Sequence, residues 1–484
     1  GCIRLMHALL GVMLIPGVLV ALAGCGPTAA DGSDSVSGTG NGLDVVLQVE
    51  GLEGGHAFLG GMLGDQYYTV DSFAVDKKGR ISFTSAGPLE QGLYYAILPD
   101  RQSQVQLLLS EDQAFTLTTR LGDLVGSMVV EGSLDNELLY RNLKFEQQYQ
   151  REYQAIRQRQ AQAQPGSPDA LSLENERKAK LEERKAHIAQ YSRDYPDAFF
   201  TSFKLAGQNP EVKEPRLPSG EIDERMQLYL YRKEFWEMVD FTDGRLLRTP
   251  VYHNKLQKYF ETLMPQQVDT IIKYADYLTR QSMQHDSLFK YTANWIGVKY
   301  KEPSFMGADA VYTHMVLNFF TPELAFWSDP NEIRYLQQDA RIRNLSLPGR
   351  TGQDLSLVGL NGEEVTLHGI DARMIVLFIY TPECDNCRKE TPKVLEVYHE
   401  WRDRGVEVLG LCTLNDEAVW KDYVAKGNLD WINAYDPANP QDHTYKWHVD
   451  ITPELYVMNS DFEIVGKDLK AFQLPEIFKR VLNK

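Results

Sequence analysis

The sequence predicts a multidomain protein in which an all-β sandwich is followed by an α-helical domain and then by an α/β domain. Hydrophobic residues alternate with polar ones from residue 44 to 132 and have helical spacing from 133 to 340. From 341 to 484, segments with a strand pattern alternate with segments with a helix pattern. At 484 residues the chain is also too long for one ordinary hydrophobic core. We therefore expect three folded domains.

Composition and charge exclude some classes of function. The chain is 43% hydrophobic and 11% aromatic, as in globular proteins. Its net charge is -17, and no run of Lys and Arg supplies the basic surface that a nucleic-acid partner needs. None of its five cysteines lies between residues 26 and 383, so a disulfide-rich scaffold is not expected.

The N-terminal segment has the pattern of an export signal. Residues 6–23 are apolar, Arg4 precedes them, and the sequence Leu-Ala-Gly ends at Cys25, which resembles a bacterial lipobox. That resemblance implies a signal peptide over 1–25, whose cleavage discards Cys2, and a diacylated Cys25. Residues 26–43 are small and polar, which predicts a flexible linker. We expect a cell-envelope protein, lipid-anchored on the periplasmic side of a membrane or on the outer-membrane surface. An uncleaved membrane anchor or an ordinary signal peptide are the alternatives.

The predicted β-sandwich spans residues 44–132. Short apolar runs such as VVLQVEG, HAFLGGML and AFTLTTR are separated by Gly, Asp and Asn, and residues 51–55 and 76–79 have the composition of hairpin turns. The region resembles an N-terminal β domain of unknown function found in Bacteroidetes lipoproteins. No catalytic group is apparent in it.

The predicted helical domain spans residues 133–340. Segments 135–164 and 169–195 are separated by the breaker Pro165-Gly-Ser-Pro168, which favours an antiparallel helix pair. Further helices are expected at 220–240, 253–263, 265–284, 285–297 and 308–320. The aromatic residues here fit a helical core better than a ligand groove, and the isolated histidines give no metal site.

The redox chemistry is predicted in the α/β domain. Residues 374–380 (MIVLFIY) form an apolar run typical of a strand buried on both faces, and Cys384-Asp-Asn-Cys387 follows it at the start of a helical stretch. A thiol at a helix N-terminus ionises readily, so Cys384 is the expected nucleophile and Cys387, one turn later, the resolving thiol. Half of a zinc site or two incidental thiols are the alternatives, but no second cysteine or histidine pair is present. Cys412, at the end of an apolar strand, is expected to pack in the core.

The segment FIYTPECDNCRKETPKVLEVYHEW (378–401) resembles the thioredoxin-like domains of the TlpA/ResA group and the related AhpC/TSA set. The resemblance implies a thioredoxin-like fold over 341–484 and a helix kink at Pro392. It also implies a cis-proline loop at Thr452-Pro453 and a proton-transfer role for Glu390, for which a solvated helix carboxylate is the alternative. Many relatives carry Trp ahead of the first cysteine, whereas this chain has Tyr380 and Glu383. The predicted substrate-binding residues are Thr452, Pro453 and Tyr380.

These observations together predict an extracytoplasmic thiol-disulfide oxidoreductase, by analogy with the TlpA/ResA group a reductase. Its partners would be protein or small-molecule disulfides, an upstream thiol electron donor and a membrane, with no nucleic acid and no cofactor. A binding or scaffolding lipoprotein with a secondary thioredoxin domain is the main alternative. A thiol peroxidase is the other, although the peroxidatic pattern Pro-x-x-x-Thr before a lone cysteine is not present.

Overall fold

The computed structural model describes residues 42–302, 304–414, 416–437 and 442–482, and Cys25 and the predicted signal peptide lie outside these ranges. The chain forms two compact units, of which the first ends at Leu263 and the second begins at Met264. This boundary falls inside the range 133–340, so the helices of the predicted helical domain are divided between the two units.

The first unit begins with the predicted β-sandwich. Its two four-stranded sheets have the orders β4-β1-β7-β8 and β3-β2-β5-β6, and residues from both sheets share one hydrophobic core. The all-β prediction for this region is confirmed. The strands are Asp44–Glu50 (β1), His56–Leu63 (β2), Gln66–Ala74 (β3), Arg80–Thr84 (β4), Gly92–Ile97 (β5), Gln104–Leu109 (β6), Ala114–Arg120 (β7) and Val129–Glu131 (β8).

The two predicted turns have the expected backbone but a different role. Gly51 and Gly79 have φ of 86° and 77°, a conformation that glycine adopts without steric cost. However, each turn joins strands of different sheets, β1 to β2 and β3 to β4, so neither closes a hairpin of paired strands. Strand β3 was not predicted, because it is an edge strand whose residues are mostly exposed and therefore show no apolar alternation.

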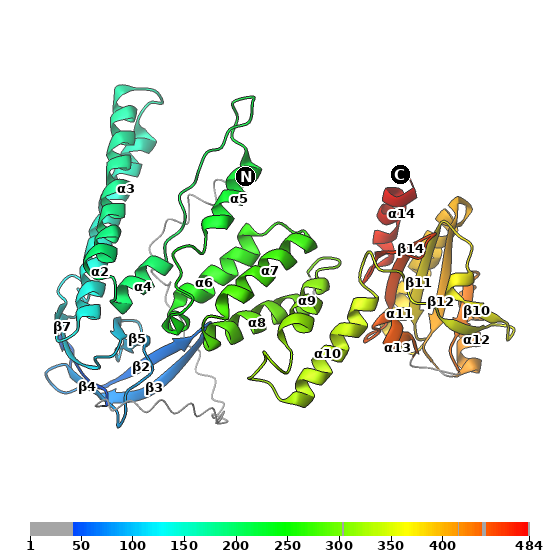
Figure 1. Cartoon of the computed structure of the whole chain (residues 1–484), viewed down its shortest axis with the longest axis horizontal. Coiled ribbons are helices and arrows are strands. Elements are labelled where there is room, and N and C mark those ends of the chain that lie inside the picture. The colour runs from blue at the N-terminus through cyan, green and yellow to red at the C-terminus, as the bar shows by residue number, and fades with distance from the viewer. Residues whose placement is uncertain (1–41, 303, 415, 438–441, 483–484) are drawn as a thin grey trace. The chain divides into compact units, whose positions relative to one another are not determined.

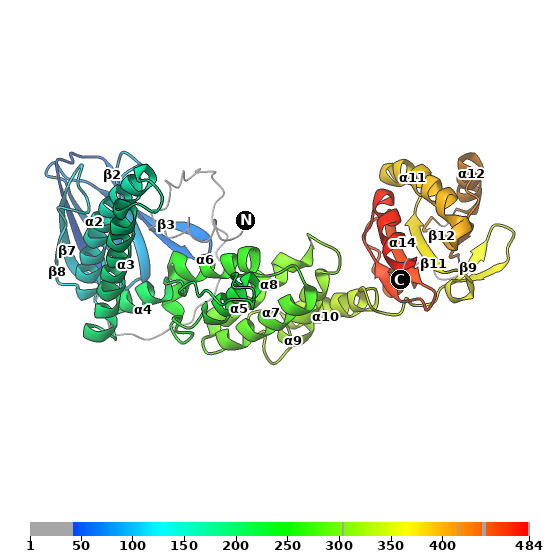
Figure 2. The same ribbon diagram turned by 90° about the horizontal axis from the view of Figure 1, so that it is seen from above.

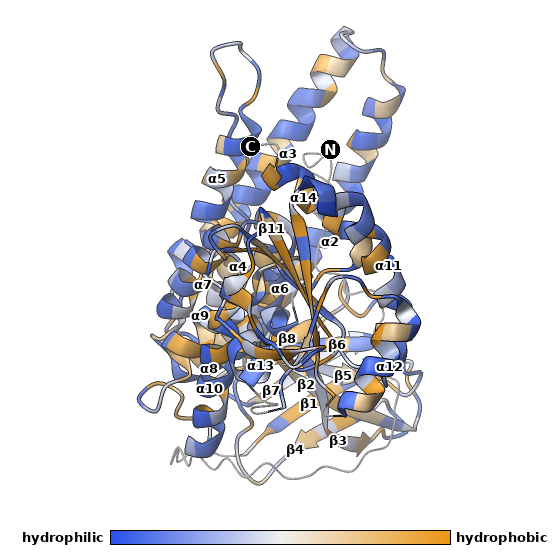
Figure 3. Ribbon diagram, turned by 90° about the vertical axis from the view of Figure 1, so that its right-hand side faces the viewer, coloured by the Kyte–Doolittle hydropathy of each residue, from blue (hydrophilic) through white to orange (hydrophobic). Residues whose placement is uncertain are grey.

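The predicted antiparallel helix pair is present as α2 (Leu134–Gln162) and α3 (Pro168–Asp194). The side chains of Ser133 and Ser167 cap their N-termini, and Pro168 occupies the first turn of α3, where it needs no hydrogen-bond donor. The pair is long (Figure 1) and mostly hydrophilic (Figure 3). The unit also contains Phe199–Ala206 (α4), Glu224–Glu234 (α5), Gly244–Arg248 (η1), Pro250–Lys258 (α6) and Tyr259–Leu263 (η2).

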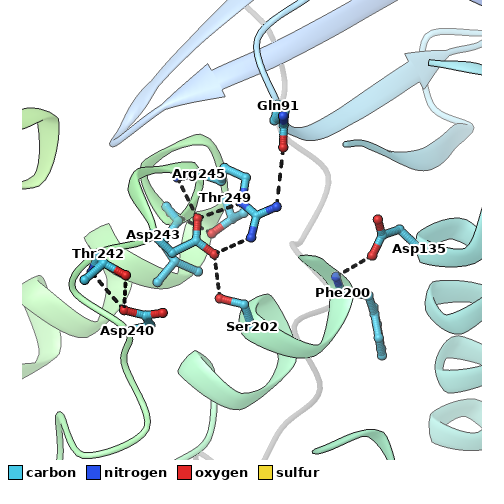
Figure 4. A network of polar contacts seen from close by, with 10 residues as sticks. Gln91, Asp135, Phe200, Ser202, Asp240, Thr242, Asp243, Arg245 and Thr249 are labelled. Carbon is cyan, nitrogen blue, oxygen red and sulfur yellow. Dashed lines mark hydrogen bonds and ion pairs between the residues drawn. The ribbon is translucent and has the colours of Figure 1, made fainter. Parts of the chain in front are cut away.

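A network of polar contacts joins the sandwich to these helices (Figure 4). The guanidinium of Arg245 forms an ion pair with the buried carboxylate of Asp243 at 2.7 Å and donates to the side-chain oxygen of Gln91 at 3.3 Å. The hydroxyl of Ser202, on α4, donates to the other oxygen of Asp243 at 2.7 Å. Three segments distant in the sequence are thus joined through the ion pair of Asp243 and Arg245.

Replacing Asp243 with asparagine is expected to lower the free energy of unfolding of the first unit by about 1–3 kcal/mol, because a buried charge-assisted network loses its anion. Urea unfolding followed by circular dichroism measures the change. Asp240→Asn is the matched control, since Asp240 is exposed and its carboxylate accepts from Thr242, two residues away. The prediction fails if the two substitutions have equal effects.

The second unit begins with the helices Val268–Ser282 (α7), Asp286–Lys301 (α8), Asp309–Phe319 (α9) and Pro330–Leu345 (α10). Three of them lie close to the predicted ranges, whereas α10 was not predicted. Within the described ranges, no helix is both long and apolar enough to cross a bilayer.

The rest of the second unit is an α/β domain built on a seven-stranded sheet of order β10-β9-β13-β12-β11-β14-β15. Its strands are Ser356–Gly359 (β9), Glu364–Thr366 (β10), Met374–Tyr380 (β11), Val406–Cys412 (β12), Ile432–Tyr435 (β13), Glu454–Asn459 (β14) and Ile464–Gly466 (β15). Its longer helices are Asp385–Trp401 (α11), Glu417–Gly427 (α12), Asp442–Trp447 (α13) and Leu474–Leu482 (α14). Strands β11 and β12 and helix α14 have the predicted bounds.

The central strand β11 lies between two layers of side chains. All seven of its residues are buried, as the continuous apolar run predicts. Residues of α11, α12 and α14 pack in the core on one face, and Trp447 of α13 packs in the core on the other. Figure 2 shows α11 and α12 along the same face of the sheet. The segment that contains Cys384 and Cys387 therefore follows the carboxyl end of this buried strand.

Candidate active site

The cysteine pair begins the helix that follows the central strand. Cys384 is the N-cap residue of α11, with φ -85° and ψ 123°, and its sulfur accepts a hydrogen bond from the backbone N–H of Cys387 at 3.3 Å. The sulfur thus occupies the place that a serine or aspartate oxygen takes in most N-caps. Both cysteines are free thiols in the structure.

The two thiols differ in exposure and in acidity. Cys384 is partly exposed, whereas Cys387 is 0% exposed. Desolvation acts against ionisation of Cys384, but hydrogen bonds from the Cys387 thiol, Thr452 and the N–H groups that begin the helix outweigh it, and its pKa lies below the ordinary value. Burial raises the pKa of Cys387 to about 11. The accessible thiol is therefore also the one that ionises first.

A loop with a cis peptide bond lies against Cys384. The bond joins Thr452 to Pro453, the position that the family resemblance implies. The thiol of Cys384 donates to the carbonyl oxygen of Thr452 at 3.3 Å. Thr452 and Pro453 are both partly exposed, so a molecule that reaches Cys384 also meets this loop.

Glu390 lies one turn after Cys387 on α11 and is only 7% exposed. Its carboxylate accepts a hydrogen bond from the backbone N–H of Ala471 at 2.7 Å and forms an ion pair with Lys393 at 3.1 Å. Desolvation favours the neutral acid, but these two donors outweigh it, so the pKa of Glu390 lies below its ordinary value. The group is an anion at neutral pH.

Two further predicted residues lie beneath the pair. Tyr380 is 0% exposed and stacks on Phe378 at a centroid distance of 5.2 Å, so it supports the site from the core. The predicted substrate contact for Tyr380 does not agree with this position, because β11 is covered on both faces. Cys412 is 1% exposed and pairs with Tyr380 across β11 and β12, and burial raises its pKa to about 12.

A chain of hydroxyl groups that the sequence does not predict lies behind Cys387. Thr391 donates to the carbonyl oxygen of Cys387 at 2.8 Å, and Tyr423, on α12, donates to the hydroxyl of Thr391 at 2.9 Å. Thr391 could have been found from its spacing of four residues, which places it on the helix face of Cys387. Nothing in the sequence indicates the contact with Tyr423.

Two exposed apolar side chains border the site. Ile451, 72% exposed, immediately precedes Thr452, and Phe472, 78% exposed, immediately follows Ala471. In the part of the chain that the structure describes, no group of three or more His, Cys, Asp or Glu side chains could hold a metal ion. The site consists of a dithiol, a carboxylate and an apolar border.

Two parts of the chain match known protein families. Residues 348–467 match the AhpC/TSA family, and residues 44–139 match a domain of unknown function, DUF4369. The prediction of a C-terminal thioredoxin-like α/β domain related to the AhpC/TSA family is confirmed. No curated protein matches the chain in sequence.

Solved structures resemble parts of the chain. A thioredoxin-like protein from Bacteroides caccae is 14% identical and covers 56% of this chain and 98% of its own, with a TM-score of 0.45. A domain of a possible thiol-disulfide isomerase from Cytophaga hutchinsonii is 23% identical and covers 28% of this chain and 92% of its own, with a TM-score of 0.27. A thiol:disulfide interchange protein from Bacteroides sp. is 20% identical and covers 29% of this chain and 93% of its own, with a TM-score of 0.28.

Proposed function

We propose that the C-terminal domain is a thiol-disulfide oxidoreductase in which Cys384 attacks substrate disulfides and Cys387 resolves the intermediate. The observation that carries the proposal is the asymmetry of the pair: an exposed, helix-capping thiol of lowered pKa stands beside a fully buried thiol whose pKa is about 11. An exchange enzyme needs this difference, because only one sulfur has to meet the substrate.

In the first step the Cys384 thiolate attacks one sulfur of the substrate disulfide. A bond forms between Cys384 and that sulfur, the substrate S–S bond breaks, and the other substrate sulfur leaves as a thiolate that takes up a proton. The N–H of Cys387 stabilises the Cys384 anion before attack. No cofactor is needed for this step.

In the second step Cys387 loses its proton and attacks Cys384 in the mixed disulfide. The Cys384–Cys387 bond forms and the second substrate thiol is released, so two electrons pass from the protein to the substrate. A thiol whose pKa is about 11 is protonated at neutral pH, so this step needs a proton acceptor. The Glu390 carboxylate, one helical turn away, is ionised and is the proposed acceptor, although its lowered pKa makes it a weak base. An external thiol donor then reduces the disulfide again.

The proposed direction and location rest on the sequence. We place the protein in the cell envelope with a lipid on Cys25 because the segment ending at Cys25 resembles a lipobox. We assign it as a reductase because the cysteine motif resembles that of the TlpA/ResA group. The scaffold alternative predicts that partner binding survives without the cysteines, and the peroxidase alternative predicts peroxide consumption.

The redox potential of the pair tests the proposal. A soluble form of the chain without residues 1–25 is equilibrated in buffers of defined thiol-disulfide ratio, alkylated and analysed by mass spectrometry. We expect a reversible two-electron transition at Cys384 and Cys387 while Cys412 stays reduced, with a midpoint in the range of reductants, about -270 mV for thioredoxin itself. Absence of a disulfide at every ratio, or co-purification of zinc with the pair, would refute the assignment.

A further inference from the structure

Two loops of the α/β domain border the active site, and both begin at a residue held by the helices that precede the domain. His448 lies four residues before Thr452, whose carbonyl oxygen contacts Cys384. Lys467 lies four residues before Ala471, whose N–H binds Glu390. The helices and both loops belong to the same compact unit.

The first loop is held by Asp339 of α10. One oxygen of Asp339 lies 3.0 Å from the Nε2 atom of His448, and the other accepts from Arg343 at 3.1 Å and from the hydroxyl of Tyr312 at 3.2 Å. Their side chains are largely buried, with exposures of 19% for Asp339 and 12% for His448. His448 and Arg343 outweigh the effect of desolvation and lower the pKa of Asp339 to about 2, so Asp339 stays charged.

The second loop is held by Asp309, the first residue of α9. Its carboxylate forms an ion pair with the ammonium of Lys467 at 2.6 Å, and the two side chains are 1% and 3% exposed. The residues are 158 positions apart in the sequence. A buried pair of this kind is sensitive to geometry, since loss of either partner leaves a buried charge without compensation.

The backbone at both contacts has an unusual conformation. His448 and Asp468, which follows Lys467, have φ of 52°, in the left-handed region that non-glycine residues rarely adopt. Such a conformation persists where the surrounding contacts fix it. The contact between Asp339 and His448 and the ion pair between Asp309 and Lys467 therefore lie where the two loops turn toward the active site.

We propose that Asp339 and Asp309 are positioning residues of the redox site, which orient the loops that carry Thr452 and Ala471 against Cys384 and Glu390. Helices α9 and α10 are then part of the active centre, although no residue of theirs touches the cysteines. The proposal rests on the redox role of the pair, but it can be tested without any disulfide exchange.

The reactivity of Cys384 is the readout. A loosened first loop moves Thr452, whose carbonyl oxygen accepts a hydrogen bond from the Cys384 thiol at 3.3 Å and whose side chain is one of the groups that lower the pKa of that thiol. The other groups that act on this sulfur are Cys387 and the backbone N–H of Asn386, and neither contacts Asp339. A change at Asp339 therefore reaches Cys384 through the loop.

The experiment compares Asp339→Asn with Asp276→Asn in the otherwise unchanged chain. Asp276, on α7, binds Arg280 at 2.8 Å and His314 at 3.1 Å, so it has the same kinds of partner but contacts neither loop. Alkylation of Cys384 by iodoacetamide is measured by mass spectrometry from about pH 5 to about pH 9. We expect Asp339→Asn to shift the midpoint of the profile by up to about one pH unit, and so to change the alkylation rate at neutral pH by about threefold to tenfold.

A second variant separates positioning from misfolding. His448→Asn removes the ring that Asp339 binds, while asparagine tolerates the left-handed backbone. Its alkylation profile is expected to shift in the same direction as that of Asp339→Asn, and Asp276→Asn is expected to keep the profile of the unchanged protein. If Asp339→Asn and His448→Asn both alkylate with the profile of Asp276→Asn, the positioning role is refuted, whatever the redox titration of the pair gives.

Discussion

Replacing Cys384 with serine is expected to reduce disulfide exchange on the order of 1000-fold or more, because a serine hydroxyl neither ionises at neutral pH nor forms a disulfide. Reduction of a disulfide-bonded peptide by the pre-reduced protein measures the effect. The fold should be unaffected, since Cys384 is partly exposed and serine is also a favourable N-cap residue.

Two further variants sharpen this result. Cys387→Ser should still make the first attack but accumulate the mixed disulfide with the peptide, visible as a covalent adduct by mass spectrometry. Cys412→Ala should keep full exchange, since Cys412 is 1% exposed and its pKa is about 12. Exchange that persists in Cys384→Ser, or that disappears in Cys412→Ala, would contradict the assignment of the nucleophile.

The cysteine pair could be predicted from sequence because all its determinants are local. Strand β11, the loop after it and the first turn of α11 are contiguous, so the apolar run and the spacing of the cysteines suffice to place Cys384 at a helix N-terminus. The same run also predicts that β11 is covered on both faces. All residues of β11 are indeed buried, and Tyr380 is the last of them. This burial conflicts with the substrate contact predicted for Tyr380.

The partners of the pair could not be predicted in this way because they come from distant segments. The cis Thr452–Pro453 bond was expected only from the family resemblance, and the donor to Glu390 is a backbone N–H, which has no sequence signature. The contact of Asp309 with Lys467 spans 158 positions, and both residues look like ordinary surface charges in the sequence. Only the tertiary contact between the start of α9 and the segment after β15 explains why these charges are buried.

Glu454, the first residue of β14 and the neighbour of Pro453, is expected to make the second unit less stable as the pH rises. It is 6% exposed, and one of its carboxyl oxygens has no hydrogen-bond partner. Desolvation, and then the charges of Asp468 and Asp450, raise its pKa from 4.5 to about 8. Between these two values the folded protein holds a proton that the unfolded chain has released. The free energy of unfolding should therefore fall by about 1.4 kcal/mol per pH unit in that window.

The variant Glu454→Gln isolates this effect, because glutamine has nearly the same shape but does not ionise. The variant should be more stable than the unchanged protein at pH values near 8, where the penalty for the buried acid is largest, and the difference should shrink toward pH 5, with the pKa of about 8 setting the upper end of the window. Urea unfolding followed by tryptophan fluorescence reports mainly on the second unit, because Trp236 is the one tryptophan before residue 264.

Glu417→Gln is the control, since the Glu417 side chain is 54% exposed. An unfolding midpoint that does not depend on pH in the unchanged protein, or a Glu454→Gln variant that is less stable at every pH, would show that the buried carboxyl is not protonated in the folded state.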